Sequence, residues 1–418
     1  MPLPRLIVDA ALAVGPKVAG GALTLALGLV LVGHLEAADY GRYAYAVTLI
    51  LLADAVIGTP FDLAVIRLVQ TRVGGDDAGA AAVERTAFWL KLAVTAMLAA
   101  AAAPVAGAAT GGLMPLVAAG AGSLMALRSA LLHLQLRQRF RAYGAVELAH
   151  VALKLGPAFA LVAAGAATPG AILACLAIGP ALAALAALPL IRAAVRPAPR
   201  RLAPAGPVAR LVLWYAPTLA LGATLGQLDI LMLGHLGPAE TLGRYGAAAV
   251  AASVPAMLGM YLGVVLTPTV VRRAAAGTLR PFFARAQITL TLAALFAGGG
   301  IAALLASPLT ARLPPDYAAA VPVFALLIPG MLLAMTTSAM ALPVVMVARK
   351  GFLLTLDAVV APLAVAGYVL AIAAAGATGA AAVALGVHVL RSLAVLAAAW
   401  AITARPARLA QDAPMPLA

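Results

Sequence analysis

The chain has 418 residues, of which 64% are hydrophobic and 10% charged, and its mean hydropathy is +1.06. This number of polar side chains is too small to cover the exterior of a soluble protein. The composition therefore excludes a soluble globular fold. The formal net charge of +14 shows a strong basic excess, whose placement along the chain is informative. A membrane-spanning helix needs about 20 apolar residues, so this chain can hold about a dozen spans.

Apolar runs, interrupted by glycine, proline or charged residues, predict twelve membrane-spanning helices. They are expected over residues 10–35, 43–66, 86–107, 110–134, 143–165, 169–191, 210–236, 245–271, 286–306, 319–347, 352–375 and 378–403. The N-terminus contains Arg5, Asp9 and Lys17 and is interpreted as leading into the first span, not as a signal peptide. Cys175 is the only cysteine, which excludes an internal disulfide and a cysteine-cluster metal site.

Charge separates the connections between these helices into two kinds. The basic connections are 67–85, 135–142, 192–210, 272–285 and 348–351, and with the two termini they hold most of the 28 Lys and Arg residues. The opposite connections carry only Arg42, Arg244 and Arg312. Since positive residues beside spans stay in the cytoplasm, both termini are expected there. The basic excess then reflects topology, and no nucleic-acid partner is expected.

Two stretches, Leu31–Tyr43 and Leu231–Tyr245, repeat the pattern Gly-His-Leu, a short polar turn and Gly-Arg-Tyr. Upstream, Pro16 aligns with Pro217, so the match covers a whole span and its outer turn. Six spans separate the copies, so both face the same side of the membrane. This predicts a parallel repeat of two halves with a substrate site between them.

The predicted fold is an all-α polytopic membrane protein with about twelve transmembrane helices in two six-helix halves. The N-terminal half is expected over residues 1–195 and the C-terminal half over 210–418. Residues 196–209, rich in Pro and Arg, are predicted to form a cytoplasmic linker. Contact with lipid headgroups is the alternative role of this segment.

The second copy of the repeat carries a family resemblance. The run "APTLALGATLGQLDILMLGHLGPAETLGRYGAAA" resembles the start of the second half of polysaccharide flippases, including those for O-antigen repeats, of the multidrug, oligosaccharidyl-lipid and polysaccharide exporter superfamily. The matching residues are Pro217, Asp229, Gly234, Gly243, Tyr245 and, in the next helix, Pro268. Gly58-Thr59-Pro60 in the second span departs from the family pattern.

This resemblance implies an exporter in the bacterial cytoplasmic (inner) membrane that works by alternating access. Its substrate would be a polyprenyl-pyrophosphate-linked glycan, moved from the cytoplasmic to the periplasmic leaflet for polysaccharide or lipopolysaccharide biosynthesis. The implied partners are this lipid-linked oligosaccharide and the bilayer, and docking of a glycan polymerase is left open. Neither a cofactor, a metal nor a catalytic residue is implied.

Charged residues within the predicted spans are the candidate site, because each costs about 2.5–3.5 kcal/mol at mid-bilayer unless it faces protein or water. The cations predicted to bind the pyrophosphate are Lys17, Lys154, Arg391, Lys91 and Arg128. Lys91 and Arg128 lie nearer the cytoplasmic ends of their helices, where snorkelling to the interface is the alternative, and the same alternative is open for Lys17. His388 stands three residues before Arg391, on the same helix face.

Glu147, His150 and Lys154 occupy one stripe of the fifth predicted helix, which is therefore expected to face the bundle interior. The stripe is either a self-neutralising network that fixes helix packing or a cavity wall that offers Lys154 to an anion. The predicted ion-coupling residues are Asp54, Glu147, His150 and Asp357, with a proton or sodium as the coupled ion in an antiporter. The alternative for Asp54, Asp62 and Asp357 is pairing with the buried cations.

Three other functions would each require features that can be sought in the sequence. A multidrug exporter of the same superfamily would favour a cavity dominated by carboxylates, whereas buried Lys and Arg are at least as prominent here. A facilitator of another six-plus-six fold would carry a Gly-Asp-Arg-Gly-Arg type loop that 67–80 lacks. A glycan polymerase or ligase would need a large outer loop, and the longest outer connection runs only from Ser307 to Ala318. Neither a phosphate-binding loop nor a hydrolytic motif is present, so no enzymatic activity is expected.

Overall fold

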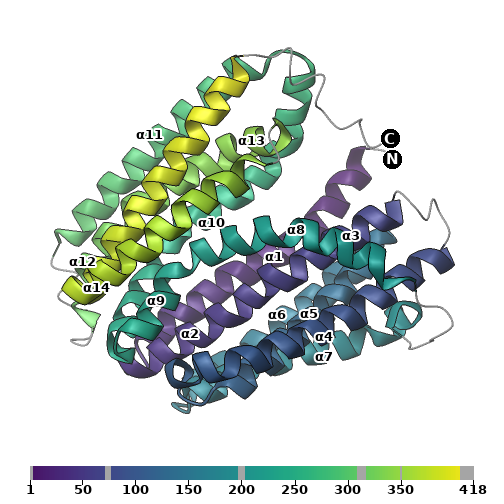
Figure 1. The fold of residues 1–418 in the computed structure, drawn as a ribbon, viewed down its shortest axis with the longest axis horizontal. Coiled ribbons are helices and arrows are strands. Elements are labelled where there is room, and N and C mark those ends of the chain that lie inside the picture. The colour runs from purple at the N-terminus through teal and green to yellow at the C-terminus, as the bar shows by residue number, and fades with distance from the viewer. Residues whose placement is uncertain (1–2, 71–76, 196–202, 308–316, 349–350, 405–418) are drawn as a thin grey trace. The chain divides into compact units, whose positions relative to one another are not determined.

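The computed structural model describes residues 3–70, 77–195, 203–307, 317–348 and 351–404 (Figure 1). The described residues form helices joined by short connections and contain no strand, as the membrane requires of backbone that cannot bond to water. By their contacts they divide into two compact units, Met1–Gln227 and Leu228–Ala418. Residues 196–202, within the predicted linker, and 308–316, within the longest outer connection, lie outside the described residues.

Among the described residues, the first unit contains eight α-helices, and a π-helical segment lies between the second and the third of them. They are α1 (Leu3–Val32), α2 (Ala37–Ala53), η1 (Asp54–Gly58), α3 (Thr59–Leu68), α4 (Asp77–Thr110), α5 (Met114–Leu136), α6 (Phe140–Ala163), α7 (Pro169–Val195) and α8 (Ala205–Gly226). The helices α5, α6 and α7 pack against one another, and α6 also packs on α1. Much of the connection predicted over 67–85 is helical, because α4 starts several residues earlier than its apolar pattern indicates.

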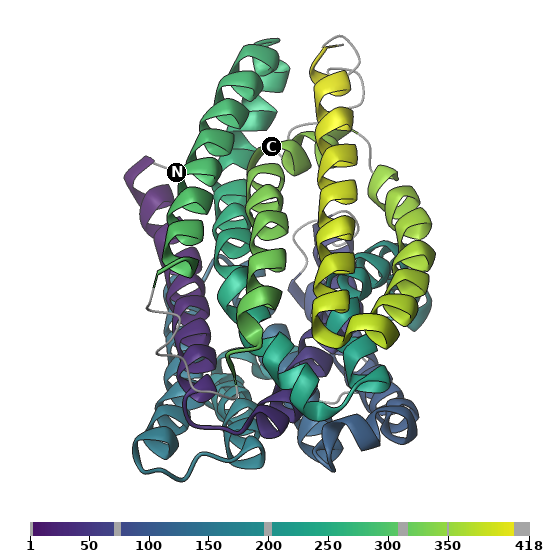
Figure 2. The same ribbon diagram turned by 90° about the vertical axis from the view of Figure 1, so that its left-hand side faces the viewer.

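The second unit begins at the break between α8 and α9. Its elements are α9 (Leu228–Leu236), α10 (Ala239–Ala275), α11 (Leu279–Leu305), α12 (Ala320–Thr336), η6 (Thr337–Ala341), α13 (Leu342–Ala348) and α14 (Phe352–Thr403). Eleven helices in the described residues are long and apolar enough to cross a membrane. The last of them, α14, is a hairpin whose two arms meet at Gly376, where φ is 55°, a conformation that glycine adopts without strain (Figure 2). The expected twelve spans are therefore accounted for, and the chain is a multi-pass all-α membrane protein.

The two copies of the repeated stretch have the same local structure. In each, the histidine Nδ1 donates to the carbonyl four residues earlier, His34 to Val30 at 2.9 Å and His235 to Leu231 at 3.0 Å. The next helix then starts after a residue with extended backbone, Glu36 in the first copy and Pro238 in the second. Repeated sequence thus gives a repeated turn, while superposition of the two halves about an axis along the membrane normal stays a prediction.

The π-helical segments η1 and η6 each precede a proline. Pro60 follows η1 and Pro343 follows η6, in each case six residues after the first residue of the π segment. Proline has no N–H to donate and its ring clashes with the preceding turn, and a wider π turn accommodates this inside a continuous helix. In η1 the carbonyl of Asp54 accepts from the backbone N–H of Thr59 and also from its hydroxyl, the latter at 3.4 Å.

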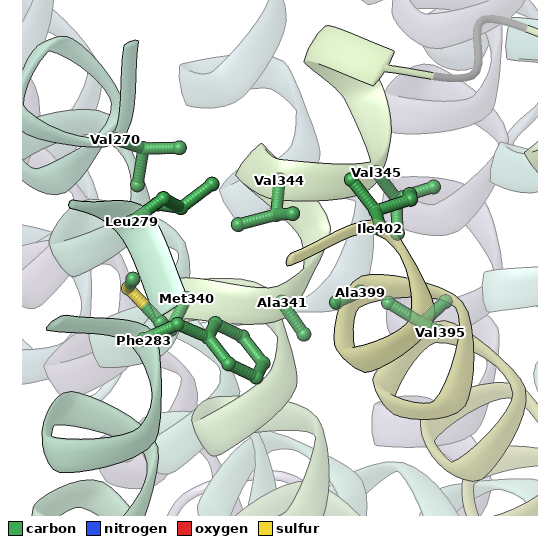
Figure 3. Close-up of a cluster of buried hydrophobic side chains, with 10 residues drawn as sticks. All are labelled: Val270, Leu279, Phe283, Met340, Ala341, Val344, Val345, Val395, Ala399 and Ile402. Atoms are coloured by element: carbon green, nitrogen blue, oxygen red, sulfur yellow. The ribbon is translucent and has the colours of Figure 1, made fainter. Parts of the chain in front are cut away.

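The core of the second unit lies where α10, α11, η6, α13 and α14 meet (Figure 3). Phe283 is fully buried there and packs with nine smaller side chains, namely Val270, Leu279, Met340, Ala341, Val344, Val345, Val395, Ala399 and Ile402. Beside this core, Gly259 and Gly263 let α10 approach the π segment closely. A Cβ on Gly259 would lie 2.5 Å from the Met335 carbonyl oxygen, and one on Gly263 would lie 2.6 Å from that of Ser338. Such small-residue contacts hold membrane helices together.

Gly259→Ala should destabilise the protein by about 1–3 kcal/mol, because the added methyl group forces α10 away from backbone atoms that cannot yield. Gly300→Ala on α11 is the matched control, since a Cβ there meets open space. Unfolding in mixed micelles with increasing denaturing detergent measures both. Equal stability of the two variants would contradict the close approach.

The orientation of the first unit can be tested at the two ends of α6. Arg139 and Ala166 are exposed in the connections before and after this helix. After Cys175→Ala, Ala166→Cys should react with an impermeant thiol reagent added to intact cells. Arg139→Cys should react only after permeabilisation, because its connection is the basic one. The reverse labelling pattern would overturn the cytoplasmic placement of the termini.

Candidate functional site

Two glycines bring α1 and α7 close to α6, the helix that carries the predicted polar stripe. A Cβ on Gly20 of α1 would lie 2.6 Å from Val151 Cγ2, and one on Gly179 of α7 would lie 2.6 Å from Lys154 Cα. Close packing on both sides fixes α6 around Lys154. This packing is a prerequisite for any precise placement of the stripe.

The stripe itself faces the interior of the unit, as predicted. Glu147 and His150 are each only 9% exposed. Lys154 is half-buried, and its Nζ donates to Thr24 Oγ1 at 3.2 Å, while the Thr24 hydroxyl donates to the carbonyl of Gly20 at 2.7 Å. Lys17, on the same helix as Thr24, lies over the Tyr143 ring of α6 with its Nζ 5.3 Å from the ring centre.

An ion pair joins η1 to α5. Arg128 Nη2 donates to Asp54 Oδ2, and the Arg128 side chain is 40% exposed. Asp54 Oδ1 lies directly over Gly58, where a Cβ would be only 2.5 Å from it. The glycine that departs from the family pattern therefore leaves room for the carboxylate in the π turn.

Arg128 connects this pair with the stripe on α6. The positive charges that act on Glu147 are Lys17, Arg128 and Lys154. Arg128 also acts on His150 and on Asp54, and the neighbouring Asp62–Lys91 pair acts on Asp54 as well. We call the residues of this network the cationic cluster: Lys17, Asp54, Arg128, Glu147, His150 and Lys154. Its three cations outnumber its two carboxylates, so the cluster carries an excess positive charge when the imidazole is neutral.

Three buried polar atoms of the cationic cluster have no hydrogen-bond partner among the described residues. They are Asp54 Oδ1, Glu147 Oε2 and His150 Nδ1. Buried polar atoms of folded proteins are nearly always bonded, so unsatisfied ones point to a missing ligand, water or proton. The cluster thus offers both cations and hydrogen-bond acceptors to a bound molecule.

Lys91 occupies a different position from the one its sequence suggests. Its side chain is 2% exposed, with Nζ 2.5 Å from Asp62 Oδ1 and 3.3 Å from Ser129 Oγ. It therefore does not snorkel to the interface, because the Asp62 carboxylate on α3 provides a nearer counter-charge. Each of the three aspartates pairs with a cation: Asp357 with Arg391, as the alternative expects, and Asp62 and Asp54 with Lys91 and Arg128, not with Lys17 or Lys154.

In the second unit Arg391 and Asp357 face each other across the two arms of α14. Arg391 Nε donates to Asp357 Oδ1 at 2.8 Å and Arg391 Nη2 to Oδ2 at 3.1 Å, a bidentate pair in which Asp357 is 3% exposed. His388 lies beside Gly330 of α12, where a Cβ would be 3.1 Å from the histidine Cβ. Joint action of Arg391 with Lys17 and Lys154, and ion coupling at Asp357, remain predictions.

Asp229 is one of the residues that carry the flippase resemblance. It lies at the start of α9, just after an interruption of the helix that the repeat does not predict. The helix stops at Gln227, and Asp229 Oδ1 accepts the N–H of Ile230 at 2.8 Å at the start of α9. Tyr245 donates its hydroxyl to Asp229 Oδ2 at 2.5 Å. The aligned residue of the first half, Gly28, lies within the continuous helix α1. An acidic side chain that binds backbone N–H groups favours such an interruption.

Sequence reasoning missed a third polar group, made of Glu84, His133 and Arg137. Glu84 Oε2 bonds with His133 Nδ1, and Arg137 Nη1 donates to Glu84 Oε1 at 2.7 Å. Glu84 was assigned to a connection, although it lies in the second turn of α4. The spacing of His133 and Arg137, one helical turn apart, was the available signal.

The described residues hold no group of three or more His, Cys, Asp or Glu side chains arranged to bind a metal ion. The polar groups above are mixed pairs of acids and bases instead. Their chemistry is that of ion pairing, proton binding and anion recognition.

No family model matches this sequence, and no curated protein matches it. Solved structures match over nearly the whole chain. "Lipid II flippase MurJ, inward closed conformation" aligns with a TM-score of 0.73 at 10% identity, covering 96% of this chain and 91% of that chain. An inward-facing multidrug resistance MATE family transporter of the MOP superfamily aligns with a TM-score of 0.61 at 15% identity, covering 94% and 96%. A eukaryotic MATE transporter aligns with a TM-score of 0.53 at 11% identity, covering 97% and 98%. At such identities the likeness establishes the fold: this chain has the fold that these flippase and transporter structures share.

A double-mutant cycle tests the pair between Asp54 and Arg128. Arg128→Gln alone should destabilise the protein more than the double variant with Asp54→Asn, because it leaves a buried carboxylate without a counter-charge. We expect a coupling free energy of about 1 kcal/mol, since Arg128 is partly exposed. The matched control is Arg42→Gln with Asp39→Asn, an exposed pair at 3.0 Å whose coupling should be smaller. Equal coupling in the two cycles would show that burial does not strengthen the inner pair.

Proposed function

We propose that this protein is a flippase that moves a polyprenyl-pyrophosphate-linked glycan across the bacterial inner membrane by alternating access. The observation that carries the proposal is the cationic cluster, whose cations outnumber its carboxylates and whose buried acceptors lack partners. Both termini would lie in the cytoplasm, and the glycan would pass from the cytoplasmic to the periplasmic leaflet. Docking of a glycan polymerase is compatible with this role.

The cations of the cluster suit a phosphate-bearing headgroup. Lys17 and Lys154 come from two helices: the Lys17 ammonium lies over the Tyr143 ring, and Lys154 donates to the Thr24 hydroxyl. Lysine binds phosphate as a compact charge with three donors, and in a low-dielectric interior this attraction is strong. A pyrophosphate would offset the excess positive charge of the cluster.

The acceptors of the cluster suit the sugars. Glu147 Oε2, Asp54 Oδ1 and His150 Nδ1 can accept hydrogen bonds from hydroxyl groups, which a glycan has in abundance. Cations and acceptors within one network match a molecule that is anionic at one end and rich in hydroxyls at the other. The likeness to the MurJ fold supports the same class of substrate, a lipid with a glycan headgroup.

Export of multidrug-type cationic compounds is the second candidate, supported by the MATE fold and by the two buried carboxylates of the cluster. A hydrophobic cation would meet Glu147 and Asp54 only beside Lys17, Arg128 and Lys154, which repel it. The balance of charge therefore favours the anionic substrate. A role as a glycan polymerase or ligase has no support in the site.

Lys154→Ala should reduce flipping of a lipid-linked glycan at least roughly tenfold, because one charge-assisted hydrogen bond to phosphate contributes about 1.5–3 kcal/mol. Lys154→Arg should retain part of the activity, since the charge is kept. Proteoliposomes with a fluorescent polyprenyl-pyrophosphate oligosaccharide measure this, by the fraction of probe that an impermeant reagent reaches in the outer leaflet.

Thr24→Val separates the charge of Lys154 from its structural contact. This variant removes the hydrogen bond between α1 and α6 but leaves the ammonium group in place. We expect Thr24→Val to flip at close to the wild-type rate. If Thr24→Val and Lys154→Ala lose activity equally, or if folded Lys154→Ala flips normally, Lys154 does not bind the substrate.

A further inference from the structure

Four exposed arginines gather where α10 ends and α11 begins, and we call them the arginine corner: Arg272, Arg273, Arg280 and Arg285. The salt bridges among the described residues involve none of them. Between Glu240 and Asp357 the sequence has a single acidic residue, Asp316, which lies in the predicted outer connection at the other end of the spans. The corner therefore has no counter-charge within its own part of the chain.

Two arginines of the corner lie over aromatic rings of neighbouring helices. Arg273, at the end of α10, has its Cζ 5.6 Å from the centre of the Phe282 ring on α11. Arg280 of α11 has its Cζ 5.9 Å from the centre of the Trp400 ring on α14. Trp400 in turn packs against Phe283, with 6.1 Å between ring centres, and Phe283 belongs to the core in Figure 3. Both arginines are therefore held in place across the ends of three helices.

The guanidinium groups of the corner keep hydrogen-bond donors available for a ligand. Arginine has five N–H donors, and a cation–π contact occupies none of them with an oxygen acceptor. Arg272 uses one donor, since its Nη2 donates to Thr269 Oγ1 at 3.3 Å. The planar guanidinium group matches the oxygens of a phosphate in pairs and is more weakly hydrated than an ammonium group. A phosphate is therefore the anion that this corner is best suited to bind.

Beside the corner, α11 presents an apolar face with little cover. Its members are 60% to 88% exposed and recur every three or four residues after Arg285, namely Ile288, Leu292, Leu295 and Phe296. Among the candidate spans of the described residues, α11 buries the smallest share of its length. At a rise of about 1.5 Å per residue, Phe296 lies about 16 Å along the helix from Arg285. This distance is close to one hydrocarbon leaflet, which is about half of 30 Å.

We propose that the arginine corner binds the headgroup phosphate of an anionic glycerophospholipid, with one acyl chain of this lipid along the exposed face of α11. Four arginines favour a headgroup with a net negative charge, such as phosphatidylglycerol, over phosphatidylethanolamine, whose ammonium group they repel. A symmetric contact with a second copy of the chain would place arginines beside arginines, so charge disfavours it. The bound lipid stabilises the ends of α10, α11 and α14 against separation. The site uses no residue of the cationic cluster, so it does not depend on the proposed glycan.

Quenching of Trp400 fluorescence by spin-labelled phospholipids tests the headgroup. Trp400 is 49% exposed, and Trp89→Phe with Trp214→Phe leaves it as the only tryptophan of the purified full chain. In nanodiscs, phosphatidylglycerol labelled near the headgroup end of an acyl chain should bind beside Trp400 at least about fivefold more strongly than phosphatidylethanolamine with the same label. High salt should reduce this preference. Equal quenching by the two lipids would overturn the proposal.

Arg280→Gln with Arg285→Gln should reduce the preference to below about twofold, because two of the four charges are lost. The matched control is Arg139→Gln with Arg141→Gln, which removes two exposed arginines at the start of α6. It should keep the preference. Equal loss in the two double variants would show a response to overall charge and refute a site at the corner. Inorganic phosphate in excess should not displace the lipid, and displacement by it would overturn the assignment to a phospholipid.

The acyl chain is tested by a reporter on α11. With the native tryptophans replaced by phenylalanine, Phe296→Trp places a single indole on the apolar face. Lipid labelled at the methyl end of an acyl chain should quench it with the same preference for phosphatidylglycerol. Leu363→Trp is the matched control, since Leu363 is 62% exposed on α14, and there the two lipids should quench equally. No preference at Phe296→Trp, or an equal preference at Leu363→Trp, would contradict a lipid bound along α11.

Discussion

A charge inside an apolar layer has no bulk water to stabilise it, and this constraint explains the placement of most polar side chains in the chain. Lys91 meets Asp62, Arg128 meets Asp54, and Arg391 meets Asp357, each pair joining two different helical segments. The cost of burying one ion is several kcal/mol, and only a close partner offsets it. Ion pairs therefore determine which faces of the helices contact each other, and apolar packing fills the remaining space.

Only part of the cationic cluster follows this rule, which is why the cluster is the best candidate for binding. Arg128 meets Asp54, but Lys154 donates to a hydroxyl group, and acceptor atoms of Glu147 and His150 have no partner in the described structure. A fully satisfied network would stabilise one state of the protein. A network with unsatisfied members gains stability when a ligand or proton arrives, and a transporter needs that difference between its loaded and empty states.

Much of the architecture could be predicted because the relevant signals are local. Apolar runs gave the spans, and the polar spacing of Glu147, His150 and Lys154 correctly predicted an interior stripe. The residue on another helix with which a charged side chain pairs could not be predicted in the same way. The sequence pattern puts Glu84 in a connection and leaves both phosphate binding and snorkelling open for Lys91. Hydropathy reports how apolar a segment is and says nothing about which residue of another helix lies opposite.

The sequence by itself determined that the chain spans the membrane, with about twelve helices, a repeated outer turn and an uneven distribution of basic residues. These properties follow from composition and from spacing within one helix, where 3.6 residues per turn fix each position. Only the tertiary structure decided that Arg128 joins Asp54 to the α6 stripe and that Glu84 meets His133. Such contacts depend on where helices distant in sequence cross, and small residues such as Gly58 and Gly179 set those crossings by permitting close approach.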